Sequence, residues 1–288
     1  MFKEQNKKNV LFYSLGIFLI VNTLIWTILS GGRWFDIIPP GETQLPEFAG
    51  NTHRVFGPFY MLAFFTIQTN FFTGITTTII GFKNNSNKAK NWFFGSVVLI
   101  TITFLVYWAI LAPLTELYKW SDPYFVISTL FTHGINPIIG FVVLFMIKNE
   151  FILDKKIIGW ICLFMSIYVV FHSFFYSAGA HLKEVLDDDD GNSTGEYTIV
   201  FPYIYGFLDV RKILFINGIE KYPWLVVIIN MICFLIAPLI AVGLSWIWAK
   251  SLRLKSTNNS YYKWMDRIKE KINNKKEVSK NIDIVNEN

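Results

Sequence analysis

Long apolar runs alternate with short polar connections along most of the chain. Each run holds about 20 residues or more, which is the length that an α-helix needs to cross a hydrocarbon core of roughly 30 Å. Backbone amides inside lipid must find partners within their own segment, so helices are the economical interpretation. The pattern predicts six spans, at residues 10–30, 57–82, 92–115, 124–147, 157–178 and 223–249.

The predicted fold class is all-α, a polytopic membrane protein built as a bundle of six transmembrane helices. Residues 1–249 form the transmembrane domain, and residues 250–288 form a basic tail. The first run follows three lysines, as a signal peptide would. It is longer than a typical signal-peptide core and is followed by no small-residue cleavage pattern, so we interpret it as a span.

Composition agrees with this class. The chain is 53% hydrophobic and only 16% charged, whereas soluble domains are about 25% charged. The net charge of +5 comes largely from the tail after residue 249. A basic tail beside an anionic membrane surface accounts for that charge, so we predict membrane lipids as partners and no nucleic-acid binding. The oligomeric state is left open.

The lysines and arginines predict the orientation in the membrane. Bases gather in alternate connections and in the tail, and such connections face the cytoplasm. Both termini are therefore predicted to be cytoplasmic, in a cell membrane, which requires an even number of spans. Outside the tail, the basic positions of the segments predicted to be cytoplasmic are Lys3, Lys7, Lys8, Lys83, Lys88, Lys90, Lys148, Lys155 and Lys156.

One predicted span carries a polar stripe. Thr66, Asn70, Thr73 and Thr77 recur at helical spacing, so they share one face of the 57–82 helix. That face must meet protein or water. Threonine and asparagine often join membrane helices by hydrogen bonds, and this structural role is one interpretation of the stripe.

A histidine lies at the depth of the first residue of that stripe. Thr66 is nine residues from Gly57, and His133 is nine residues from Tyr124, so each lies about 13 Å from the outer surface at helical rise. His172 lies about 9 Å below the outer end of its span by the same count. Because Pro137 opens the helix about one turn earlier, His133 either fills a packing gap beside a freed carbonyl or serves a small polar pocket.

The chain offers little other chemistry. No acidic or basic residue falls well inside a span, which disfavours a charge-driven transporter. Neither Cys162 nor Cys233 has a matched histidine nearby, so no metal site is predicted. A haem held by His133 and His172 is disfavoured because the histidines lack regular spacing. No phosphate-binding loop or serine elbow occurs, so no cofactor is predicted.

Three short strings resemble a known family. They are Phe65-Thr66-Ile67-Gln68-Thr69-Asn70, His133-Gly134-Ile135-Asn136-Pro137, and Phe201-Pro202-Tyr203 with Phe207-Leu208-Asp209. In order and spacing they are similar to the bacterial branch of the androgen-induced protein family, which includes mollicute membrane proteins. The resemblance covers residues from about 10 to 249.

The resemblance implies an intramembrane hydrolase of fatty-acyl esters. Thr66 then takes the place of the nucleophile and His133 that of the base. Asn70 or Asn136 would supply hydrogen bonds to the developing oxyanion, and His172 or Tyr168 would orient His133. The alternative is a non-enzymatic membrane protein, either a scaffold or a carrier of a small solute or lipid.

Two further segments are expected at membrane surfaces. Residues 200–219 are aromatic but interrupted by Pro202 and Gly206, so they are expected at the outer interface, as a seal or as a substrate gate. Residues 261–272 of the tail are expected as a short basic helix on lipid or as a solvated segment.

Overall fold

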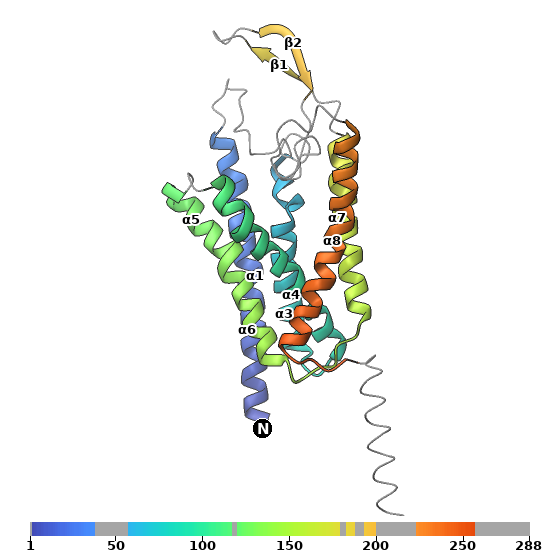
Figure 1. Ribbon diagram of the computed structural model, residues 1–288. Helices are drawn as coiled ribbons and strands as arrows, with labels where there is room; N and C mark the ends of the chain where they lie inside the picture. Colours follow the sequence, from blue (N-terminus) through green and yellow to red (C-terminus); the bar gives the residue numbers. More distant parts are fainter. Residues whose placement is uncertain are drawn as a thin grey trace, which may run out of the picture.

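The computed structural model describes residues 2–37, 57–116, 120–178, 183–187, 193–199 and 223–256, and its helices form one elongated bundle (Figure 1). Most helices are α-helices, η1 is a 3-10 helix, and η2 and η4 are π-helices. The helices are α1 (Phe2–Ile37), η1 (Gly57–Ala63), α3 (Phe65–Phe82), α4 (Asn87–Val106), η2 (Tyr107–Glu116), α5 (Pro123–Thr129), η4 (Leu130–Ile135), α6 (Asn136–Ile147), α7 (Lys156–Ala178) and α8 (Pro223–Ser251).

Consecutive helices join into rods at the positions of the predicted runs. The rods are α1, η1 with α3, α4 with η2, α5 with η4 and α6, α7, and α8. In the described residues, four helical stretches are long and apolar enough to cross a membrane: Asn6–Leu29, Asn87–Pro113, Pro123–Ile147 and Phe234–Ser251. The chain thus has the helices of a multi-pass membrane protein, while the count of six spans stays a prediction.

The predicted span 57–82 is not one continuous α-helix. Residues Gly57–Ala63 form the 3-10 helix η1, Phe64 is extended with φ −72° and ψ 130°, and α3 begins at Phe65. The hydroxyl of Tyr168 on α7 accepts from Phe65 N and donates to Ala63 O, both at 3.1 Å. A side chain from another helix therefore satisfies the backbone at this break.

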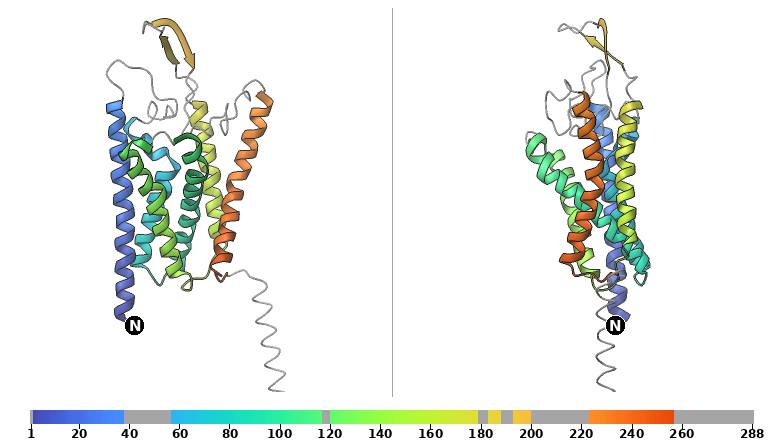
Figure 2. Two further views of the ribbon diagram at one scale, coloured as in Figure 1. Left: turned by 60° about the vertical axis from the view of Figure 1, so that its left-hand side comes forward. Right: turned by 45° about the vertical axis from the view of Figure 1, so that its right-hand side comes forward.

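The two ends of the described chain lie at the same end of the bundle (Figure 2). Residues 148–155, which connect α6 to α7, contact both the N-terminal helix α1 and the residues that follow α8. Lys8 of α1 pairs with Glu150, and Leu153 N donates to Lys255 O at 2.7 Å, just after α8. This arrangement is the one that an even number of crossings requires.

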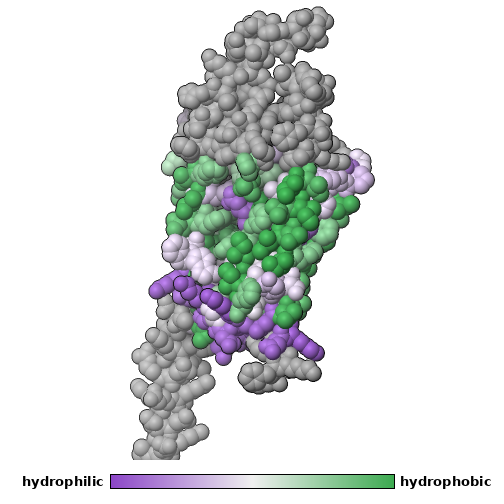
Figure 3. Space-filling model, turned by 180° about the vertical axis from the view of Figure 1, so that it is seen from behind, coloured by the Kyte–Doolittle hydropathy of each residue, from purple (hydrophilic) through white to green (hydrophobic). Residues whose placement is uncertain are grey.

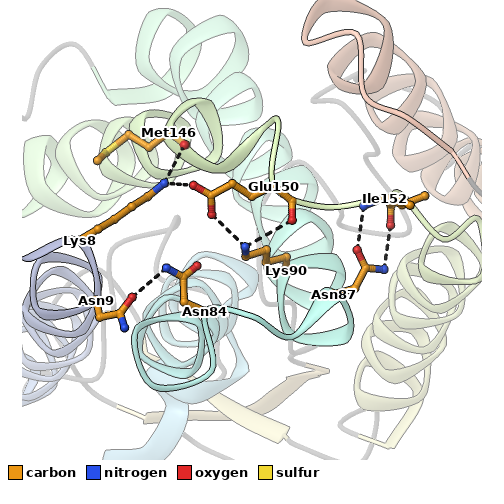
Figure 4. A network of polar contacts seen from close by, with 8 residues as sticks. All are labelled: Lys8, Asn9, Asn84, Asn87, Lys90, Met146, Glu150 and Ile152. Atoms are coloured by element: carbon orange, nitrogen blue, oxygen red, sulfur yellow. Dashed lines mark hydrogen bonds and ion pairs between the residues drawn. The ribbon is translucent and has the colours of Figure 1, made fainter. Parts of the chain in front are cut away.

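A polar network closes that end of the bundle (Figure 4). Glu150 accepts from Lys8 and from Lys90 Nζ of α4, the latter at 2.9 Å. Asn9 of α1 accepts from Asn84 at 2.8 Å, and Asn87 of α4 pairs with both backbone groups of Ile152. Two of the lysines predicted to face one side of the membrane, Lys8 and Lys90, thus belong to a network that ties α1, α4 and the α6–α7 connection together.

The outer surface of the bundle is apolar. A hydrophobic band covers the middle of the described part, and hydrophilic residues gather below it (Figure 3). Large apolar side chains point outward from several helices, for example Val10, Ile28, Phe145, Ile167 and Leu239. Lipid rather than water is the medium that suits such a surface.

Glycines bring α1 and α3 into close contact. A Cβ built on Gly16 of α1 would lie 2.4 Å from the backbone N of Thr78, and one on Gly81 of α3 would lie 2.6 Å from Tyr13 N. Gly74 likewise has the backbone of Ile20 at 3.1 Å. Small residues at such contacts let two membrane helices approach closely enough for dispersion to hold them.

The bundle is all-α as predicted, and a short β-hairpin outside it was not predicted. Strands β1 (Lys183–Asp187) and β2 (Ser193–Ile199) pair antiparallel, beyond the end of the bundle opposite the N-terminus (Figure 1). Valine, threonine, tyrosine and isoleucine in these strands favour extended backbone, a signal that the long acidic run obscured. Residues 200–219 and 261–272, for which surface positions were predicted, lie outside the described residues.

Candidate functional site

Three buried asparagines form a directed chain of hydrogen bonds at the centre of the bundle. Asn22 of α1 donates to Asn136 Oδ1 at 2.9 Å, and Asn136 of α6 donates to Asn70 Oδ1 at 2.7 Å. Asn70 of α3 then donates from Nδ2 to two backbone carbonyls, those of Thr66 at 2.7 Å and Thr132 at 3.1 Å. The chain of three side-chain amides therefore ends on two backbone carbonyls, that of Thr66 itself and that of the residue before His133.

The predicted stripe on α3 faces protein. Asn70, Thr73 and Thr77 are fully buried, and the neighbouring Thr69 shares a hydrogen bond of 2.8 Å with Thr103 of α4. Thr76 makes a bond of the same length to Ser96. Much of this polar surface therefore joins α3 to its neighbours, as the structural interpretation of the stripe predicts.

Thr66 lies in the first turn of α3. The count of nine α-helical residues from Gly57 was wrong, because η1 and the extended Phe64 precede it. The position puts Thr66 at the end of the helix where backbone N–H groups and the helix dipole favour negative charge. Nothing in the count from Gly57 indicated that α3 would begin at Phe65.

His133 lies in the π-helix η4, immediately before the helix that contains Pro137. A proline has no N–H to give to the carbonyl four residues earlier, and that carbonyl belongs to His133. Trp108 Nε1 donates to this oxygen at 2.8 Å. The carbonyl that Pro137 was expected to free thus accepts a hydrogen bond from a side chain of η2.

The imidazole of His133 stacks on Tyr107. The ring centroids are 3.9 Å apart and the planes are 19° from parallel. Tyr107 opens η2, which contains Pro113. Sequence reasoning missed Tyr107 and Trp108, although Pro113, like Pro137, is a proline inside an apolar run and marks the same kind of local opening.

One ring nitrogen of His133 bonds to no described residue. In the described part of the chain, its buried Nδ1 atom has no hydrogen-bond partner. The Thr66 hydroxyl therefore does not reach Nδ1 in this conformation. The Asn70 bridge nevertheless brings the Thr66 carbonyl and the residue before His133 to one amide nitrogen.

The other predicted residues lie elsewhere or are already engaged. His172 is buried on α7, one turn beyond Tyr168, and Tyr168 bonds to the break before α3 rather than to His133 Nδ1. Both hydrogens of Asn70 Nδ2 point to backbone carbonyls, and Asn136 Nδ2 donates to Asn70. An oxyanion role for either amide would require these bonds to exchange.

Comparison of the chain with protein-family models, curated proteins and solved structures found no match.

Proposed function

We propose that this membrane protein hydrolyses fatty-acyl esters within the bilayer, with Thr66 as nucleophile and His133 as base. The observation that carries the proposal is the buried His133 Nδ1, which lacks a hydrogen-bond partner in the described residues and lies on a segment that Asn70 joins to Thr66. A buried polar atom without a partner costs free energy, so its persistence suggests a use. An unoccupied imidazole nitrogen is what a general base needs.

The proposed reaction proceeds in two steps. Thr66 Oγ1 attacks the ester carbonyl carbon while its proton passes to His133, and the bond from that carbon to the alcohol oxygen then breaks. The alcohol leaves with the proton from His133. A water, deprotonated by His133, then cleaves the acyl-threonine ester, which releases the fatty acid and restores Thr66.

The start of α3 supports this chemistry better than the asparagine amides do. Thr66 lies in the first turn, where the positive end of the helix dipole stabilises negative charge on an adjacent oxygen. The Asn70 amide instead donates its hydrogen bonds to backbone carbonyls. A lipid substrate suits a site whose surroundings are apolar helices.

The test is hydrolysis of p-nitrophenyl fatty-acyl esters by protein purified in detergent. We expect Thr66→Ala and His133→Ala to lose activity by at least about 100-fold, the usual scale for removing a general base, and Thr66→Ser to retain part of it. Thr27→Ala is the matched control, because the Thr27 hydroxyl donates to a carbonyl of its own helix, Thr23 O, at 2.7 Å and bonds to no other described helix. Equal activity in Thr66→Ala and Thr27→Ala would overturn the proposal.

The second candidate is a membrane scaffold without enzymatic activity. It is favoured by the asparagine chain and the threonine contacts, which use polar groups of α1, α3, α4 and α6 to hold the helices together. Absence of ester hydrolysis in folded protein at every acyl length, together with no labelling of Thr66 by an alkyl fluorophosphonate, would leave the scaffold as the better description. Labelling of Thr66 that disappears in His133→Ala would favour the hydrolase.

A further inference from the structure

Two π-helical segments meet at His133. The segment η2 contains Pro113, and η4 directly precedes Pro137 within α6. π-Helical turns are rare and often occur at functional sites. Both contacts that His133 makes across this meeting point come from the first two residues of η2, Tyr107 and Trp108.

The two contacts restrain different parts of His133. Trp108 Nε1 holds the backbone carbonyl at 2.8 Å, and the Tyr107 ring covers one face of the imidazole at a centroid distance of 3.9 Å. Tyr107 is only 2% exposed. It follows directly on α4, whose Phe93, Val97 and Ile100 are fully buried, so it is attached to a closely packed part of the bundle.

The stacking of the Tyr107 ring on the His133 imidazole takes the place of the hydrogen bond that usually orients a catalytic histidine. In hydrolases with a nucleophile and a histidine, a third group bonded to the second ring nitrogen sets the orientation of the imidazole. In the described part of the chain, no hydrogen bond joins another residue to either ring nitrogen of His133, so such an orienting group is not seen there. A face-to-face ring contact fixes the plane of the imidazole and leaves both nitrogens available at its edge.

We propose that Tyr107 is the positioning residue of the site: its ring sets the plane of the His133 imidazole, and Trp108 fixes the backbone that carries it. This inference rests on the proposed hydrolysis for its catalytic meaning. Its geometric part, the stack, is measurable without any substrate.

The geometric arm uses NMR of protein labelled with ¹³C-histidine in detergent micelles. The chain has four histidines, so the spectrum is simple, and His133→Gln assigns the His133 signals. A stacked ring shifts them upfield. We expect Tyr107→Phe to keep that shift and Tyr107→Leu to lose it.

The matched control is Phe104→Leu, which removes another aromatic contact between the same rods. Phe104 of α4 meets Phe141 of α6 at a centroid distance of 5.8 Å. We expect Phe104→Leu to leave the His133 signals in place. Circular dichroism and gel filtration establish that each variant is folded. Unshifted His133 signals in the unaltered protein, or a shift retained in Tyr107→Leu, would overturn the stack.

The catalytic arm measures kcat and KM on a p-nitrophenyl acyl ester. We expect Tyr107→Leu to lower kcat by about 10- to 100-fold with little change in KM, because a displacement of roughly 1 Å at a reacting group costs on the order of 100-fold. We expect Tyr107→Phe to keep the kcat of the unaltered protein, because phenylalanine retains the ring. Unchanged kcat in Tyr107→Leu would overturn the positioning role alone. An inactive unaltered protein would overturn the proposed hydrolysis, and the positioning role with it.

Discussion

Asparagine 136 is the middle member of a chain that joins three helices. Its amide accepts from Asn22 and donates to Asn70, and all three residues are buried. Replacing it with alanine leaves two amides without their partner in an apolar surrounding. Hydrogen bonds between membrane helices contribute about 0.6 to 2 kcal/mol each.

We therefore expect Asn136→Ala to lower the free energy of unfolding by about 1 to 3 kcal/mol, the cost of leaving buried polar groups unpaired. Unfolding by sodium dodecyl sulfate in mixed micelles, followed by circular dichroism, measures the change. Thr27→Ala serves as the comparison, since among the described residues the Thr27 hydroxyl bonds within α1 alone. An Asn136→Ala protein that unfolds at the same detergent fraction as Thr27→Ala would contradict the structural role of the chain.

Glu150 gives the polar network that it forms with Lys8 and Lys90 a predicted dependence on pH. Burial raises the pKa of Glu150, but hydrogen bonds and charge from Lys8 and Lys90 outweigh it, and the net effect lowers the pKa below the ordinary value of 4.5. Because the folded state has the lower pKa, the stabilisation is fully present above about pH 4.5 and is lost as the pH falls through the folded-state value.

Thermal unfolding of the unaltered protein and of Glu150→Gln at pH 7 and at acid pH tests this dependence. Glutamine keeps the shape but not the charge, so the unaltered protein should unfold at a higher temperature at pH 7. The difference should shrink at acid pH. A difference that is the same at both pH values would show that the ion pairs with Lys8 and Lys90 contribute nothing measurable.

At the scale of single elements, the close contact of α1 with α3 depends on glycine. A Cβ at Gly16 would lie 2.4 Å from the Thr78 backbone, so Gly16→Ala forces the two helices apart. We expect a loss of about 1 to 3 kcal/mol, as for overpacked cores. Gly159→Ala on α7 is the matched control because nothing lies within 4 Å of its added Cβ. Thermal unfolding in detergent compares the two, and equal midpoints would contradict tight packing of α1 on α3.

The π-helix η4 makes a second element-scale prediction through Pro137 and Trp108. Trp108→Phe leaves the His133 carbonyl without its donor and should cost about 1 to 3 kcal/mol. In the Pro137→Ala background, the new backbone N–H can take that carbonyl, so the same Trp108→Phe change should cost less. A double-mutant cycle on the free energy of unfolding measures the coupling. Equal costs in both backgrounds would mean that Pro137 does not free the carbonyl.

The sequence predicted elements better than it predicted their internal geometry. The polar stripe was confirmed to face protein at Asn70, Thr73 and Thr77, because helical periodicity alone decides which residues share a face. The continuous α-helix assumed in counting the depth of Thr66 was wrong, because η1 and the extended Phe64 precede α3 and their rise per residue differs from that of an α-helix. Tyr107 was missed because aromatic residues are common in this chain, and only the packing of η2 on η4 distinguishes it.

At the scale of the whole molecule, the position of the connections makes the orientation testable. The N-terminal part of α1, the α3–α4 connection, the α6–α7 connection and the residues after α8 meet at one end of the bundle through contacts such as Asn9 with Asn84 and Leu153 with Lys255. Lysines are frequent at that end, and such segments stay on the cytoplasmic side. The predicted topology therefore has both termini inside and an even number of crossings.

Single cysteines introduced into a protein lacking Cys162 and Cys233 test that topology in intact cells. Exposed positions at the lysine-rich end are Lys7, Asn85 and Lys155, and Ser121 is exposed in the connection at the opposite end. We expect a membrane-impermeant maleimide to label Ser121→Cys in intact cells and the other three only after permeabilisation, because all three share one side. Labelling of Asn85→Cys from outside while Lys155→Cys stays protected would separate the α3–α4 and α6–α7 connections across the membrane. The number of crossings between the two connections would then be odd, so that one of the two rods between them, α4 with η2 or α5 with η4 and α6, does not span.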